Sequence, residues 1–94
     1  MNLDAIDFPA VELGSDEQWA MICIPQVGAS RRILLGRDLP TAKRFMQLEF
    51  NERRNRGAFV IPGQPGKWSV VTRVGDTSIE DRYTVVIMPL GVTV

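Results

Sequence analysis

Short apolar runs separated by turn residues dominate the first part of the chain. Two of these runs, Gln18–Ile24 (QWAMICI) and Arg31–Leu35 (RRILL), have the length and the β-branched and aromatic content of strands. The segment between them, Pro25–Ser30, contains a proline and a glycine and is typical of a hairpin connection. The pattern therefore predicts two antiparallel strands before any helix.

The longest periodic stretch is Asp38–Gly57 (DLPTAKRFMQLEFNERRNRG), which predicts the one helix. Asp38 suits the N-cap, and Pro40 is tolerated in the first turn because its missing N–H would have no helical partner there. Gly57 suits the position after the last turn. Arginines near the carboxyl end of the helix interact favourably with the negative end of the helix dipole.

After the helix the apolar period returns to that of strands. Three further strands are expected, at Ala58–Ile61, Trp68–Val74 and Arg82–Met88, with a loop at 62–66 and a polar turn at 75–81. Short connections favour antiparallel pairing. The chain is thus expected to be α+β, an antiparallel sheet of about five strands with a single helix between strand groups, in the order β-β-α-β-β-β.

The two ends of the chain give weaker patterns. Residues 1–7 are predicted to form a flexible arm, and residues 8–13 can at most be an edge strand because Pro9 cannot donate to a ladder. Residues 91–94 either continue the last strand along an edge or trail from it. The whole chain of 94 residues is expected to be a single domain with one core.

The predicted helix has an apolar side and a polar side. At 100° per residue its apolar set covers an arc of about 200°, which is expected to pack on the sheet; the set is Ala42, Phe45, Met46, Leu48 and Phe50. Glu49 and Arg53 fall inside this arc and can pair with each other. Either both lie beyond the packed region, which we favour, or Glu49 is partly buried and bonded to Arg31, Arg32 or Arg73.

The strands are apolar on nearly every position, although a sheet with one solvated face should alternate. A single helix covers only one face. The other face must be covered by closing the sheet into a barrel or by a second copy of the chain. Because the glycines fall mainly in loops rather than inside strands, the homodimer is favoured over a strongly bent barrel.

Several kinds of chemistry are excluded by composition. The chain has no histidine and only one cysteine, so catalytic triads, Cys–His pairs and cysteine–histidine zinc sites cannot form. Cys23 lies in an apolar strand and is expected to be a small buried hydrophobe. The GQPGK segment at 63–67 lacks the spacing of a phosphate loop. No catalytic site, cofactor or metal is predicted.

Charge is zero overall but uneven along the chain. Residues 1–30 sum to −5, residues 31–56 sum to +5, and the remainder balances. The opposite segments can compensate each other in the fold, which we favour, or leave a basic face exposed. The polar side of the helix is basic and rich in amides, and it is the candidate partner site; it consists of Lys43, Arg44, Gln47, Asn51, Arg54 and Asn55. Arg31, Arg32 and Arg37 are secondary candidates.

These features predict a small non-catalytic protein-interaction module that binds a macromolecular partner, for which an acidic protein surface is one candidate, and that forms a homodimer. Small accessory proteins of bacteria and phages, including inhibitors of host defence, often have this composition. The alternative is a nucleic-acid-binding or regulatory protein that uses the basic helix face, although a pI near 6.2 argues against it. With no signal-peptide pattern and no long apolar run, a cytoplasmic location is expected and no membrane or small molecule is implied.

Overall fold

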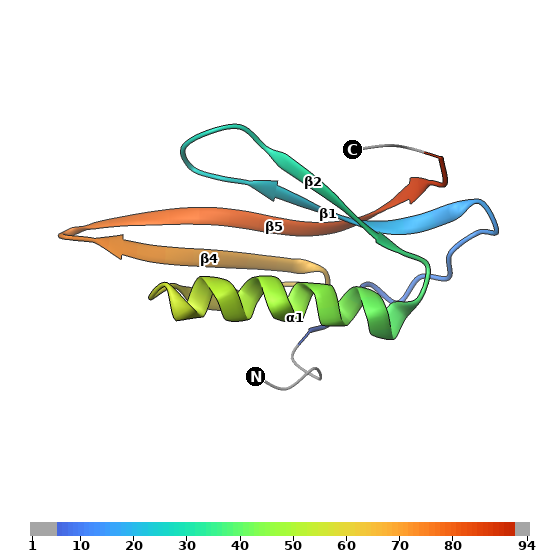
Figure 1. The fold of residues 1–94 in the computed structure, drawn as a ribbon, viewed down its shortest axis with the longest axis horizontal. Helices are drawn as coiled ribbons and strands as arrows, with labels where there is room; N and C mark the ends of the chain where they lie inside the picture. Colours follow the sequence, from blue (N-terminus) through green and yellow to red (C-terminus); the bar gives the residue numbers. More distant parts are fainter. Residues whose placement is uncertain (1–5, 92–94) are drawn as a thin grey trace.

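The computed structural model describes residues 6–91. Its elements run β1 (Glu17–Ile24), β2 (Arg31–Gly36), α1 (Leu39–Asn55), β3 (Phe59–Pro62), β4 (Lys67–Val74) and β5 (Thr77–Pro89). The strands form one antiparallel sheet in the order β2-β1-β5-β4-β3, and α1 lies along one face of it (Figure 1). The predicted α+β fold and its β-β-α-β-β-β order are confirmed.

The central strand, β5, is longer than the sequence predicted. It spans 13 residues and pairs with β1 on one side and with β4 on the other. The turn predicted at 75–81 is wrong beyond its first residues, because β5 begins at Thr77 and only Gly75 and Asp76 separate it from β4. Residues 77–80 are polar or half-exposed because this end of the β4–β5 hairpin has few core residues to contact.

The ends of α1 follow the predicted signals. The Asp38 carboxylate accepts a hydrogen bond from the Thr41 amide at 3.1 Å, which satisfies one of the unpaired donors of the first turn. Pro40 lies in that first turn, and Gly57 follows the helix with a φ of +90°. The left-handed backbone at Gly57 ends the helix at little steric cost.

The core lies between α1 and one face of the sheet, here called the inner face. Its largest fully buried side chains include Tyr83, Phe50, Met21 and Met46. The rings of Phe50 and Tyr83 meet edge to face with centroids 5.4 Å apart, and Phe50 also contacts Trp68 at 5.3 Å. Such aromatic pairs add to the stabilisation given by burial alone.

The segment before β1 completes this core instead of forming an edge strand. Phe8 packs edge to face on Trp19, with ring centroids 5.2 Å apart, and Ile6 is fully buried. The predicted flexible arm of residues 1–7 lies mostly outside the described residues, but its last two residues are held here. The Asp7 carbonyl accepts a hydrogen bond from the Gly66 amide at 2.7 Å.

Gly66 is the point at which this segment approaches the sheet most closely, and it provides a test. Gly66 has a φ of +81°, and a Cβ at this position would lie 2.8 Å from Cδ of Pro9. We expect Gly66→Ala to lower the free energy of unfolding by about 2–3 kcal/mol, through backbone strain and displacement of Pro9. Gly75→Ala is the control, since it has a φ of +62° with open space around it and should cost about 1 kcal/mol. Equal losses in urea titrations would contradict this packing.

The opposite, outer face of the sheet has no second layer over it within residues 6–91. Its apolar side chains at the centre, such as Ile22, Leu34, Val86 and Met88, are half-buried by their neighbours on the strands. The sheet does not close into a barrel, because β2 and β3 stay at its two edges. The homodimer expected from the apolar strands stays a prediction.

Candidate protein-interaction site

The apolar side of α1 is divided between the core and solvent. Ala42, Met46 and Phe50 are fully buried, as predicted. Phe45 and Leu48 are 51% and 59% exposed, so the prediction that they belong to the core is wrong. The helix is rotated about its axis, relative to the predicted orientation, so that its buried side centres on Met46 and Phe50. The buried arc is therefore narrower than the apolar arc of about 200° predicted from the sequence.

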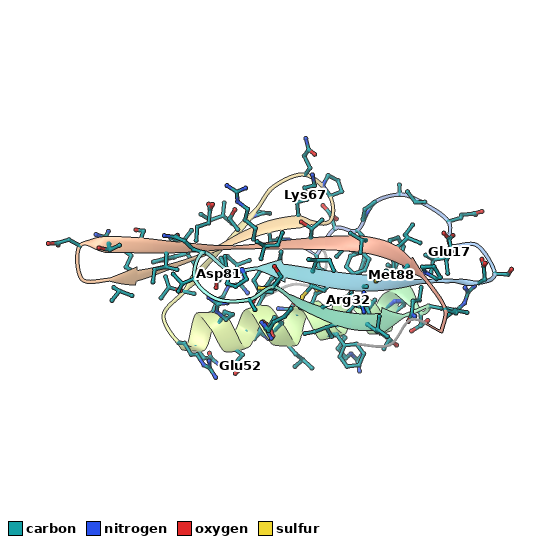
Figure 2. All side chains as sticks on the ribbon, turned by 90° about the horizontal axis from the view of Figure 1, so that it is seen from above. Glu17, Arg32, Glu52, Lys67, Asp81 and Met88 are labelled. Carbon is teal, nitrogen blue, oxygen red and sulfur yellow. The ribbon has the colours of Figure 1, made fainter. Side chains whose placement is uncertain are left out.

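Phe45 and Leu48 line a groove between α1 and the edge strand β2. The groove has a volume of about 250 Å³ and is lined mainly by apolar side chains, with two carboxylates at one end; its lining residues are Met21, Ile33, Leu34, Leu35, Phe45, Met46, Leu48, Glu49 and Glu52. β2 and α1 contact each other, and Figure 2 shows β2 next to α1 on the side of the sheet where the helix lies. An apolar groove beside an edge strand is a surface that protein partners commonly use.

The six residues of the predicted basic partner face are separated by this rotation. Arg44 and Asn55 are exposed, whereas Lys43, Asn51 and Arg54 are half-buried. Gln47 is only 8% exposed, and its Nε2 donates to Oδ1 of Asn51 at 3.0 Å. Long polar side chains can cover apolar surface with their stems, which explains how this side of α1 turns partly toward the sheet. That the six residues bind a partner stays a prediction.

The three secondary arginines are also placed apart. Arg31 faces the helix and binds Glu49, and Arg32 follows it on the outer face of the sheet. Arg37 donates to the carbonyl oxygens of Gly14 and Glu17, at 2.7 and 2.5 Å, and so ties the β2–α1 loop to the start of β1 and to the segment before it. The structure gives Arg31 and Arg37 roles within the fold.

Glu49 belongs to a polar network beneath the second half of α1. This polar network consists of Arg31, Glu49, Arg53, Asp81 and Tyr83. One carboxylate oxygen of Glu49 accepts from the Tyr83 hydroxyl at 2.6 Å and from Arg31 at 3.2 Å. The favoured interpretation, with Glu49 beyond the packed region, is therefore wrong. The alternative is confirmed, with Arg31 as its partner, and these hydrogen bonds offset the cost of burying part of the carboxylate.

Arg53 does not pair with Glu49 but joins α1 to β5. Its guanidinium donates to the Tyr83 hydroxyl at 3.0 Å and to an oxygen of Asp81 at 2.7 Å. Asp81, which is 8% exposed, also accepts from the amide of Gln26 at 3.2 Å. Burial disfavours the charge of Arg53, but the hydrogen bonds and charge interactions with Asp81 and Tyr83 together outweigh it and raise the pKa of Arg53 above its usual value.

Tyr83 is held as a neutral donor at the centre of the polar network. Burial, and then the hydrogen bond to Glu49, raise its pKa well above the ordinary value of 10.0. A tyrosine with a raised pKa is a poor general base near neutral pH. With its charges paired and its hydroxyl both donating and accepting, the polar network is suited to orienting α1 on the sheet.

The raised pKa of Tyr83 predicts a loss of stability at high pH. The unfolded chain releases the tyrosine proton near pH 10 while the folded chain retains it, so unfolding becomes more favourable as pH rises above 10. Over this range the free energy of unfolding should fall by up to about 1.4 kcal/mol per pH unit more steeply in the wild type than in Tyr83→Phe. Since Tyr83 is the only tyrosine, its ultraviolet absorbance can follow the same titration. Parallel pH curves for the two proteins would show that Tyr83 titrates normally.

Cys23 and the two tryptophans lie in the core. Cys23 is buried as predicted, and Trp19 and Trp68 pack in the core. Among residues 6–91 no group of three or more cysteine or acidic side chains is arranged to hold a metal ion. Within the same range, no helix has the length and apolar content needed to cross a membrane.

Comparison with known protein families, with curated proteins and with solved structures finds no match to this chain in any of the three.

Proposed function

We propose that this protein is a non-catalytic protein-interaction module and that its partner binds in the groove between α1 and β2. One observation carries the proposal. Phe45 and Leu48 lie at the surface of α1 and are more than half exposed. They lie beside the edge strand β2, whose free edge has no partner strand within residues 6–91. Large apolar side chains gathered in a groove are typical of docking sites, whereas single exposed apolar residues are common everywhere.

The groove has the chemistry that a protein partner requires. Ile33, Leu35 and Met46 form its floor, and Phe45 and Leu48 form its rim. Apolar side chains of a partner can enter it while a backbone segment pairs with the free edge of β2. Glu49 and Glu52 at one end add charge that can fix the orientation of what binds. The polar network underneath holds α1, and so keeps the groove open in one shape.

Site-specific photo-crosslinking tests this function. A photoreactive phenylalanine analogue is placed at position 48 in cells that make the protein, and a matched protein carries it at position 27. Val27 is 76% exposed but lies in the β1–β2 loop away from the groove. We expect protein adducts from position 48 that disappear when Phe45→Asp is added, and few from position 27. Equal adducts from both positions, or none from position 48, would refute the groove as a docking site.

Protein docking in the groove is favoured over the alternative, in which the basic side of α1 binds nucleic acid. Of the arginines expected to add phosphate contacts, Arg31 and Arg37 already bond within the fold. The basic side of α1 is itself partly buried, with Gln47 8% exposed. Nucleic-acid binding predicts affinity that falls steeply with salt and with Lys43→Glu or Arg44→Glu. An accessory or inhibitor role for the module stays a prediction from composition.

A further inference from the structure

We infer that the occupant of the groove is a second copy of this chain, docked about a twofold axis that passes beside Leu48. This inference rests on the proposed function, because it names the partner that fills the α1–β2 groove. The residues along the exposed side of α1 provide the argument. They form a stripe that consists of Arg44, Phe45, Leu48 and Glu52, and all four are exposed.

The charges on this stripe are arranged symmetrically about its apolar centre. Arg44 lies four residues before Leu48, and Glu52 lies four residues after it. When two such helices pack antiparallel about Leu48, Arg44 of each copy lies opposite Glu52 of the other. Two identical ion pairs then flank a centre made of Phe45 and Leu48 from both copies. Self-complementarity of this kind is what a twofold interface requires.

The edge strand β2 is compatible with the same axis. Ile33, Leu34 and Leu35 line the groove together with Phe45 and Leu48, so the middle of β2 lies level with the middle of the stripe. An antiparallel pair of β2 strands centred between Ile33 and Leu34 places Arg31 and Arg32 opposite Gly36 and Leu35 of the other copy. Like charges are therefore kept apart, and the unpaired edges of both sheets are covered.

Glu52 is free to serve as the partner of a second Arg44. Its side chain forms an exposed ion pair with Arg56 on the same helix, at 2.6 Å, with the Glu52 and Arg56 side chains 59% and 72% exposed. Such exposed pairs within one helix contribute little and are easily exchanged. Figure 2 shows Glu52 projecting from α1 on the side away from the sheet, where a second molecule can reach it.

Charge reversal tests this arrangement by sedimentation equilibrium. Arg44→Glu places acid opposite acid at both ends of the interface, and Glu52→Arg places base opposite base. Each variant alone should dimerise about tenfold more weakly than the wild type. An equimolar mixture of the two should form a heterodimer with the wild-type affinity, because every pair is then of opposite charge. Both positions are exposed on the helix surface, so circular dichroism should show both variants folded.

Each of the following outcomes overturns the inference. A monomeric wild type at high micromolar concentration removes the second copy as the occupant. So do single variants that dimerise as strongly as the wild type, and a mixture that does not recover. Crosslinks from position 48 to a different protein would keep the proposed function and refute only the second copy. A dimer insensitive to Phe45→Asp and Leu48→Asp would also refute only the second copy as the occupant, whereas the absence of any crosslink from position 48 would refute the proposed function as well.

Discussion

Phe50→Ala is expected to lower the free energy of unfolding by about 3–5 kcal/mol, a large part of the stability of a domain of this size. Phe50 is fully buried, and it contacts Trp68 and Tyr83 with ring centroids 5.3 and 5.4 Å apart. The substitution removes buried apolar surface and also leaves a cavity between α1 and the sheet, and both effects destabilise the folded state. Urea unfolding followed by tryptophan fluorescence measures the effect.

Phe45→Ala is the matched control for this substitution. It makes the same chemical change on the same helix, at a residue that is 51% exposed and lies outside the core. At protein concentrations low enough to keep the chain monomeric, it should cost no more than about 1 kcal/mol. Similar costs at the two positions would contradict the rotation of α1 described above.

Asp81→Ala is expected to lower the free energy of unfolding by about 2–4 kcal/mol. The substitution leaves the charge of Arg53, whose side chain is 20% exposed, without its carboxylate at 2.7 Å. It also removes the acceptor of the hydrogen bond from the backbone N–H of Gln26, which ties the β1–β2 loop to β5. Removing one member of a buried ion pair costs more than the pair itself contributes, because the remaining charge stays desolvated.

Two further variants identify the cause of that loss. Adding Arg53→Met to Asp81→Ala should recover part of the stability, since no unpaired charge then remains under α1. Glu52→Ala, which breaks the exposed pair with Arg56, should change the free energy of unfolding by less than about 0.5 kcal/mol. A double variant no more stable than Asp81→Ala alone would contradict the account of the polar network.

The order and limits of most elements follow from local signals in the sequence. Asp38 and Gly57 bound the helix, and proline or glycine lies between most strands. The exception is the start of β5, where residues 77–80 form a strand although three of the four are polar. Because this end of the hairpin has solvent near both faces, its residues lack the apolar alternation by which strands are recognised.

The candidate site could be predicted only in part. Periodicity shows which side of α1 is apolar, but apolar residues of a core and those of a docking surface have the same pattern, so Phe45 and Leu48 were assigned to the core. Gln47 was assigned to solvent because amides usually lie there, yet it is 8% exposed. For Glu49, the sequence supplied the correct alternative with Arg31, but the bond to Tyr83 links positions 34 residues apart.

Hydroxyl-radical footprinting of the wild-type protein tests the central claim most directly, namely that Phe45 and Leu48 form a surface that a second copy of the chain covers. Oxidation is measured residue by residue by mass spectrometry at low and at high protein concentration. We predict that labelling of Phe45 and Leu48 falls at high concentration, while labelling of Val27 and Val74, which are 76% and 58% exposed, stays constant. Labelling of Phe45 and Leu48 that stays as high as that of Val27 at every concentration would contradict self-association through this surface.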